Sequence, residues 1–275
     1  MPNPSQTSAA ANILSHNRAA ATAWNAGGEK YDRISRQVAD AIEHCVDRLE
    51  PAPHESILDV ATGTGWTARQ TNARGATVTG VDLGADVIDA AKRFDKTQQI
   101  DFRVADAEAL PFSDQQFDAV VSTFGVMFCG DPEQAASELA RVCRPGGRLA
   151  LAVWADHGGV YDLFQVISRH KPSGPAPAHS PFDWSQPEQL EKWLGKEFTI
   201  STEAAVSYHR EKTAHDAWEA FSQGYGPVKS LLEKLDTPAT KEFQKDFEQF
   251  HEDYRTDMGI LVPRPYVLVK GIRKG

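Results

Sequence analysis

The amino-acid sequence predicts a single doubly wound α/β domain with helical additions, and three observations support this fold class. The chain has 275 residues, enough for one large domain and few for two. Short apolar runs alternate with helical patterns through its middle, as in successive βα units of a parallel sheet. The first of these runs leads into a glycine-bearing turn that opens a helix.

The first 50 residues are expected to form an N-terminal arm and lid helices. Residues 1 to about 20 are rich in Ala, Ser and Asn and predict a loose or partly helical arm. An amphipathic helix is expected next, because apolar residues repeat at helical spacing: Ile34, Val38, Ile42, Val46 and Leu49. Pro51 and Pro53 end this helix.

Residues 51–156 are expected to form the core of the sheet. The predicted strands are 56–60, 76–83, 100–104, 117–124 and 148–154. Asp131 and Pro132 predict a helix start, since an Asp cap and a proline in the first turn suit a helix N-terminus. Pro145-Gly146-Gly147 is expected to end that helix and lead into the fifth strand.

Residues 157–275 are expected to be a variable region that completes the sheet. The pattern predicts helices at 160–168 and 187–194, with a Pro-rich loop at 171–185 between them. A weakly alternating strand at 198–209, two helices within 213–257 and a last strand within 260–272 follow. We therefore expect a helical insertion between the sixth and seventh strands and no separate domain.

Composition favours a cytoplasmic globular protein. A formal net charge of −9 argues against a nucleic-acid partner, which needs a basic surface. Cys45, Cys129 and Cys143 are widely spaced, which suits a reducing compartment and predicts no metal site. No apolar stretch is long enough to span a membrane, and the polar residues 15–18 interrupt any secretion signal.

The segment around the first predicted turn carries the strongest chemical signal. Gly63 and Gly65 allow a sharp turn and the close approach of a ligand. Asp59, at the end of the preceding strand, would repel a pyrophosphate and attract an ammonium group. A glycine-rich strand-to-helix turn is common in α/β proteins, so the acid is the informative residue.

Acidic residues also follow the second and third strands. Asp82 lies at the spacing where a carboxylate meets ribose hydroxyls, although a lone Asp there is often only a helix cap. Asp106, beside free backbone N–H groups, could bind the edge of an adenine, and the alternative is a polar loop closed by Leu110-Pro111-Phe112. Because ligands of open parallel sheets bind beyond the carboxyl ends of the strands, the agreement of successive strand ends favours one nucleoside-binding site.

Residues 57–154 resemble a class I S-adenosylmethionine methyltransferase of the ubiquinone/menaquinone-biosynthesis type. The matching motifs, in order, are ILDVATGTG, VDL, ADAEALPF, FDAVVSTFGVMF, DPEQAASELARVCRPGG and LALAVW. The resemblance implies S-adenosylmethionine as cofactor and a seven-stranded sheet ordered 3-2-1-4-5-7-6, with the seventh strand antiparallel. One residue departs from the pattern: Ala61 replaces the first glycine of the turn. We expect the turn to persist, with Ala61 at negative φ.

The resemblance also implies a role for each matching position. The turn residues Asp59, Ala61, Thr62, Gly63 and Gly65 would face the methionine part of the cofactor. Asp82 would bind the ribose, with Leu83 against the adenine. The segment Asp106, Ala107 and Glu108 would bind the adenine edge. Thr123 and Phe124 would line the methionine side. Trp24 and Tyr31 resemble the family's lid, in which Tyr31 closes over the cofactor, and they serve equally well as aromatic core.

The acceptor and the catalytic base are not determined by the sequence. The segment 123–126 lacks the Asn/Asp-Pro-Pro-aromatic motif of nucleic-acid amino methyltransferases, so we expect a small-molecule acceptor and in-line transfer of the methyl group to O, N, S or C. A homodimer is compatible with the sequence. Aromatic residues could line an acceptor pocket or fill the core of the insertion: Trp24, Trp154, Phe164, Phe182, Trp184, Trp193, Trp218, Phe221 and Tyr225. Candidate bases are His157, Tyr161, His209, His215 and Tyr225, none of them favoured.

Two other functions remain open. A nicotinamide-dependent oxidoreductase would use a similar fold, but it would need a GxGxxG turn without the preceding acid. A non-catalytic subunit that binds S-adenosylmethionine without turnover would keep every one of these motifs. Binding of S-adenosylhomocysteine rather than NADH would distinguish a methyltransferase from the oxidoreductase. Transfer of a labelled methyl group would distinguish it from the non-catalytic subunit.

Overall fold

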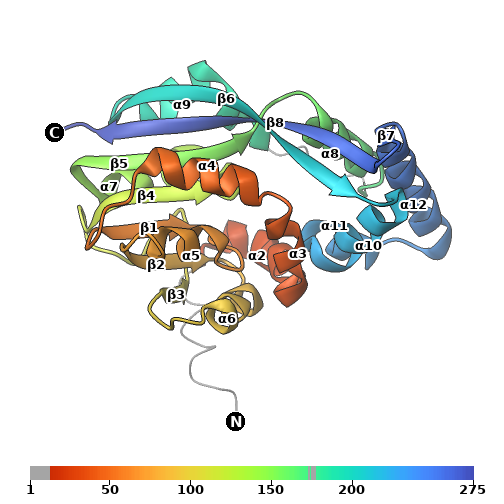
Figure 1. Ribbon diagram of the computed structural model, residues 1–275, viewed down its shortest axis with the longest axis horizontal. Coiled ribbons are helices and arrows are strands. Elements are labelled where there is room, and N and C mark those ends of the chain that lie inside the picture. The colour runs from red at the N-terminus through yellow and green to blue at the C-terminus, as the bar shows by residue number, and fades with distance from the viewer. Residues whose placement is uncertain (1–12, 173, 175–177) are drawn as a thin grey trace, which may run out of the picture.

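The computed structural model describes residues 13–172, 174 and 178–275, which form a twisted central sheet with helices on both faces (Figure 1). The strand order is β3-β2-β1-β4-β5-β8-β6, and the short β7 pairs with β8. Strands β1 to β5 run parallel to one another, whereas β8 is antiparallel to β5 and β6. The doubly wound, mostly parallel sheet is thereby confirmed. It has one strand more than predicted, because the two-residue β7 joins it.

The strands match the predicted apolar runs. Their bounds are β1 Ser56–Val60, β2 Thr77–Asp82, β3 Asp101–Val104, β4 Phe117–Thr123, β5 Cys143–Trp154, β6 Phe198–Glu211, β7 Arg255–Thr256 and β8 Gly259–Arg273. β5 starts five residues earlier than expected. Pro145-Gly146-Gly147 lies within this strand as a register irregularity against β4 and not before it, so the preceding helix ends at Val142 without a glycine stop.

Helices α4 and α5 lie in front of the sheet in Figure 1, and α7 and α9 lie behind it. The helix bounds are α2 Arg18–Asn25, α3 Tyr31–Arg36, α4 Ala39–Leu49, α5 Trp66–Asn72, α6 Ala85–Phe94, α7 Pro132–Val142, α8 Gly159–Arg169, α9 Pro187–Leu194, α10 Ala214–Gly224, α11 Gly226–Leu232 and α12 Thr237–Glu252. Short 3-10 turns occur at Ser15–Asn17, Gly28–Lys30, Val126–Phe128 and Pro181–Ser185. Asp131 caps α7 as predicted, because its side chain accepts from the Gln134 amide at 3.0 Å.

Two expectations about the helices are corrected. The helix expected over 34–49 is divided into α3 and α4 at residues 37–38. Residues 213–257 form three helices and not two, because Tyr225 adopts an extended conformation between α10 and α11. The predicted arm at 1–12 lies outside the described residues. None of the helices in the described part of the chain is long and apolar enough to cross a membrane.

Two clusters of buried apolar side chains support these layers. The larger one packs the helices against both faces of the sheet and contains Leu58 and Val120. The smaller one belongs to the insertion and packs α8, α10 and α12 through residues such as Trp218, Phe243 and Phe247.

The far end of the sheet is a long two-stranded ribbon. β5 pairs with β8 only as far as Trp154 opposite Tyr266, while β6 and β8 continue together to Glu211 opposite Ile260. Pro263 and Pro265 lie in this continuation, beyond the end of β5. Proline has no N–H group to donate, and on the β5 side of β8 there is no strand here that would need one. Figure 1 shows the ribbon reaching from the sheet to α8 and α10–α12, with α2 and α3 between.

Candidate functional site

The turn after β1 has the left-handed backbone that its glycines predict. Gly63 has φ 57° and Gly65 has φ 85°, values that glycine adopts without steric cost. A Cβ at Gly65 would lie 2.8 Å from the ring of Phe102. At Gly63 it would lie 3.2 Å from the ring of Tyr31, so Tyr31 packs directly over the turn. Gly65 then caps the start of α5.

Ala61 corrects a prediction about this turn. Its φ is +56°, in the left-handed region, and not negative as expected. The turn follows the path that a glycine would take, although an alanine pays a steric cost there. Ala61 also presses against the end of β4, because a Cβ at Gly125 would lie only 2.3 Å from the Ala61 Cβ. The tertiary fold therefore imposes the glycine conformation on Ala61.

Two carboxyl groups support the turn from adjacent strands. Asp82 accepts from the Gly63 amide at 2.9 Å and from the Gly84 amide at 3.0 Å, and burial raises its pKa. Asp59 is fully buried and accepts from the Thr62 hydroxyl at 2.5 Å, while its Oδ1 has no hydrogen-bond partner among the described residues. Burial raises the pKa of Asp59 to about 7, against the opposing effect of the Thr62 hydrogen bond.

The segment after β3 is held by the N-terminal arm. Both carboxylate oxygens of Asp106 accept from Asn17 Nδ2, at 3.1 and 3.0 Å, and one also accepts from the Leu14 amide. Glu108 pairs with His16 at 2.6 Å, and this hydrogen bond raises the pKa of the histidine. No described residue accepts a backbone hydrogen bond from the Ala107 amide. The Ala107 amide is therefore available to a ligand, whereas the Asp106 carboxylate already has partners.

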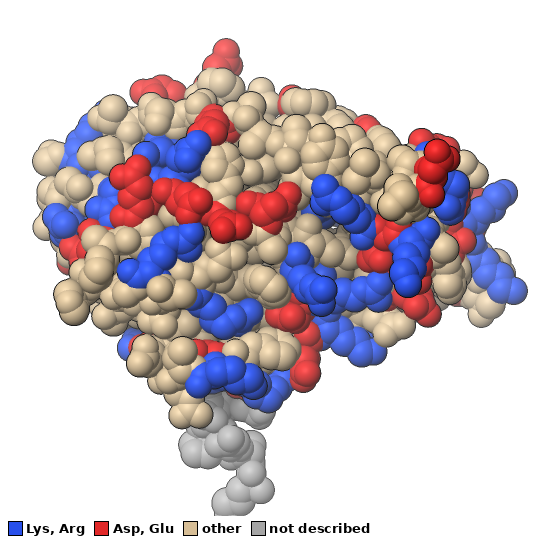
Figure 2. All heavy atoms as spheres, viewed as in Figure 1, with Lys and Arg blue, Asp and Glu red and all other residues tan. Residues whose placement is uncertain are grey.

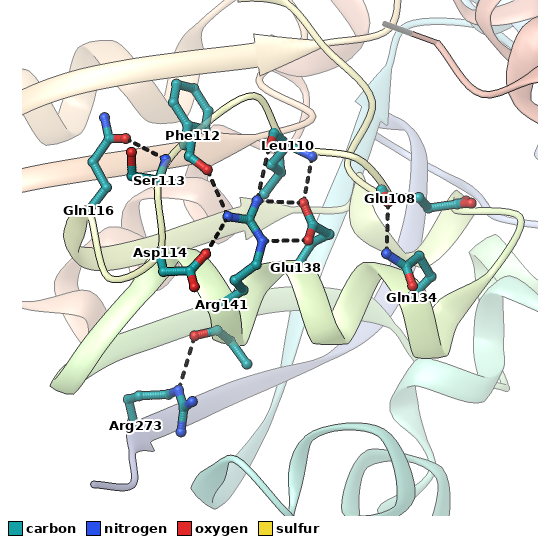
Figure 3. Close-up of polar contacts among 11 residues, drawn as sticks. Glu108, Leu110, Phe112, Ser113, Asp114, Gln116, Gln134, Glu138, Arg141 and Arg273 are labelled. Carbon is teal, nitrogen blue, oxygen red and sulfur yellow. Dashed lines mark hydrogen bonds and ion pairs between the residues drawn. The ribbon is translucent and has the colours of Figure 1, made fainter.

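An arginine on α7 fixes the loop that continues from this segment (Figure 3). Arg141 donates to the carbonyl oxygens of Leu110 and Phe112 at 2.9 and 2.7 Å. It also pairs with both oxygens of Glu138, and Glu138 accepts from the Leu110 amide at 2.6 Å. Because one guanidinium satisfies several backbone groups, the loop after β3 has a single arrangement against α7.

These elements enclose a first cavity of about 750 Å³ at the carboxyl ends of β1 to β4. Among the predicted site residues, those that line it are Tyr31, Ala61, Gly63, Asp82, Leu83, Asp106, Ala107, Glu108, Thr123 and Phe124. Asp59, Thr62 and Gly65 lie behind the turn and do not line it. Thr123 lies at its edge, where its hydroxyl is 2.6 Å from that of Thr67. The position agrees with the rule that open parallel sheets bind ligands at their carboxyl edge.

A second cavity of about 670 Å³ adjoins the first. The two share a set of four aromatic residues: Trp24, Tyr31, Phe124 and Phe128. Beyond them the walls come mainly from α8, α12 and the β6–β8 ribbon, and they are largely apolar. Phe124, at φ +56°, stacks on Trp154 with ring centroids 3.7 Å apart, which directs both rings to this junction.

The structure divides the aromatic residues and the candidate bases into two groups. Trp154, Phe164, Phe221 and Tyr225 line the second cavity together with Trp24, whereas Phe182, Trp184, Trp193 and Trp218 are buried in the core. Of the candidate bases, His209 and Tyr225 line the second cavity. His157 and His215 are exposed, and Tyr161 packs against Phe182.

Several residues of the two cavities were not predicted. Asn17 and Cys129 line the first cavity, and His251 and Arg264 line the second. A signal for Arg264 was present in the sequence, because it occupies an inward position of the last strand between apolar Val262 and Tyr266. Asn17 offered no such signal, since its partner Asp106 is 89 residues away along the chain.

Comparison with known proteins agrees with this geometry. Residues 58–151 match the family model described as a methyltransferase domain. An uncharacterized protein of Mycobacterium tuberculosis is 32% identical over 180 residues, which cover 64% of this chain and 66% of that protein. A demethylmenaquinone methyltransferase of Renibacterium salmoninarum is 38% identical over 107 residues, 39% of this chain and 44% of that protein. The chain thus spans about two thirds or less of the length of these relatives.

The fold is also similar to that of solved structures. The YcgJ protein of Bacillus subtilis superposes with a TM-score of 0.60 at 18% identity, covering 86% of this chain and 99% of that one. The fold and the family match together identify a methyltransferase domain of Rossmann-like fold over residues 58–151. In this part the chain is similar to the class I S-adenosylmethionine-dependent methyltransferases of the ubiquinone/menaquinone type.

Proposed function

We propose that the protein transfers the methyl group of S-adenosylmethionine to a small apolar molecule held in the second cavity. The observation that carries the proposal is the junction of the two cavities at Trp24, Tyr31, Phe124 and Phe128. A cofactor in the first cavity and an acceptor in the second would meet there. In-line transfer needs mainly the alignment of the two reactants and the exclusion of water. Good orientation of the reactants lowers the activation barrier by roughly 7–11 kcal/mol.

The chemistry of the first cavity fits the cofactor. Asp82 lies at its wall as an acceptor for ribose hydroxyl groups, and Leu83 and Val87 offer apolar surface to an adenine. The Ala107 amide offers a donor to the adenine ring, whereas the exocyclic amine would share Asp106 with Asn17. The unpartnered Asp59 Oδ1 lies buried under the turn, where a cationic methionine end would favour the ionised form of this carboxyl group. When bound, S-adenosylmethionine supplies an activated methyl group.

Two further features support a small acceptor. The second cavity is lined mainly by aromatic and aliphatic side chains, the kind of wall that holds a small apolar molecule. Acidic and basic residues are interspersed on the face drawn in Figure 2, without the continuous basic surface that a nucleic acid would need. We also propose that the protein acts in the cytoplasm, as its sparse, unpaired cysteines favour.

The test is methyl transfer from S-[methyl-³H]adenosylmethionine to a fractionated small-molecule extract. We expect label in an organic-extractable product, and its loss when Phe128→Trp narrows the junction. A Tyr208→Trp variant, changed at an exposed position of β6 outside both cavities, is the control. Binding of S-adenosylhomocysteine without any labelled product would favour the non-catalytic alternative. Binding of NADH in place of S-adenosylhomocysteine would favour the oxidoreductase.

A further inference from the structure

A buried arginine without a carboxylate partner lies in the wall of the second cavity. Arg264 is 6% exposed, and its guanidinium lies over the Trp154 ring at 5.6 Å. One terminal nitrogen donates to the Gln37 carbonyl and, at 3.1 Å, to the Ser207 hydroxyl. Its Nε–H has no partner among the described residues. An unused donor on a buried cation is rare in folded proteins, because each such group loses its hydration without compensation.

The nearest acid does not satisfy this charge directly. Ser207 donates to Asp40 at 2.8 Å, so Asp40 interacts with Arg264 through the serine and not as a direct ion pair. Burial lowers the pKa of Arg264 to about 10, and Asp40 opposes that change. The guanidinium is therefore still charged at pH 7, inside a largely apolar wall.

A second polar group lies on the same face of the ribbon. His209 on β6 is 2% exposed, and its Nε2 has no hydrogen-bond partner among the described residues. The pairs Ser207–Arg264 and His209–Val262 are successive same-face pairs of β6 and β8, which brings His209 next to Arg264. Burial lowers the pKa of His209, so the ring is neutral and presents one donor and one acceptor.

We infer that the second cavity binds an apolar acceptor that carries a carboxylate, with Arg264 as its anchor and His209 beside it. This inference rests on the proposed function and names the class of its substrate. A carboxylate would supply the counter-charge that Arg264 lacks and accept from its Nε–H. The aromatic walls formed by Phe164, Phe221 and Trp154 would hold the apolar body, with the reacting atom toward the junction.

The experiment compares two probes of the same shape, 2-naphthoate and 2-naphthamide, by calorimetry with and without saturating S-adenosylhomocysteine. Wild-type protein is expected to bind the carboxylate about 10- to 100-fold more tightly, the range for a hydrogen bond to a charged group. In Arg264→Gln the preference falls to about threefold or less, while affinity for S-adenosylhomocysteine stays the same. Arg210→Gln, which removes an exposed arginine of the paired strand β6, is the matched control and retains the preference.

Equal affinity of wild-type protein for the two probes, or failure to bind either, overturns the inference. So does a preference that persists in Arg264→Gln. If Arg264→Gln does not fold, the wild-type comparison still decides, and His209→Gln, expected to weaken 2-naphthoate binding severalfold, replaces it. A protein that binds 2-naphthoate but not S-adenosylhomocysteine would overturn the proposed function while leaving the anion site intact.

Discussion

The Asp82 carboxylate accepts a hydrogen bond from the Gly63 amide at 2.9 Å, which joins the end of β2 to the turn after β1. The acid that was predicted to bind a ribose thus also holds the turn that was predicted to face the methionine. The same carboxylate accepts from the Gly84 amide, so the start of α6 shares the support. One residue therefore sets the position of two walls of the first cavity.

Replacement of this residue gives the first prediction. Asp82→Ala is expected to weaken S-adenosylhomocysteine binding by about 10- to 100-fold, because it removes a charged acceptor for the ribose and loosens the turn. Calorimetry measures the effect. Asp89→Ala, at an exposed position of the following helix, is the control and should bind as wild type. Unchanged affinity in folded Asp82→Ala would show that the ribose assignment is wrong.

Asp59 gives a prediction about the pH dependence of stability. Its folded pKa of about 7 lies above the unfolded value of 3.8, so the native state holds a proton that the unfolded state releases. Stability therefore falls as pH rises from about 4 to about 7 and is constant above. The upper limit of this loss is about 4 kcal/mol.

Asp59→Asn should remove that loss, since asparagine can still accept from Thr62 and carries no charge. We expect the variant to gain about 1–3 kcal/mol in free energy of unfolding at pH 8 and nothing at pH 4. Urea denaturation at both pH values measures the difference. The variant should also bind S-adenosylmethionine more weakly. A gain of equal size at pH 4 would contradict the titration of Asp59.

The contact between Ala61 and Gly125 gives a third prediction. Ala61→Gly should raise the free energy of unfolding by about 0.5–1 kcal/mol. It relieves the strain of an alanine in the left-handed region, and the greater conformational entropy of glycine in the unfolded chain offsets part of that gain. Gly125→Ala should lower it by about 1–3 kcal/mol, because its Cβ would overlap that of Ala61. In the double variant part of that loss should return. Additive effects in this cycle, measured by thermal denaturation, would mean that the two residues do not interact.

Much of the fold could be predicted from periodicity and capping residues. The first strand and the helix opened by Pro187 have the predicted bounds, because hydrophobic spacing and proline act locally. The strands whose ends form the first cavity were predicted from the alternation of short apolar runs with helical patterns. The places where prediction failed are those where contacts distant in sequence decide the conformation.

Ala61 and Arg264 illustrate this limit. Local preference favours negative φ for alanine, yet the turn packed against Gly125 and Tyr31 imposes +56°. An arginine in a terminal strand is ordinarily exposed, and only the pairing of β8 with β6 and its packing on Trp154 bury Arg264. The junction of the two cavities likewise depends on helices α2 and α3 meeting α10 and α11, which no local pattern encodes.

The last prediction concerns the loop fixed by Arg141 (Figure 3). Arg141→Lys should cost about 1–3 kcal/mol of stability, because lysine cannot satisfy Glu138 and the Leu110 and Phe112 carbonyls together. Arg255 is the matched control, since it also pairs with a glutamate three residues earlier, Glu252, but at an exposed site. Arg255→Lys should change stability by less than about 1 kcal/mol. The loop carries Ala107 toward the first cavity, so Arg141→Lys should also weaken S-adenosylhomocysteine binding severalfold. Hydrogen exchange of residues 106–112 measures the loosening, and protection equal to that of the wild-type protein would show that Arg141 does not hold the loop.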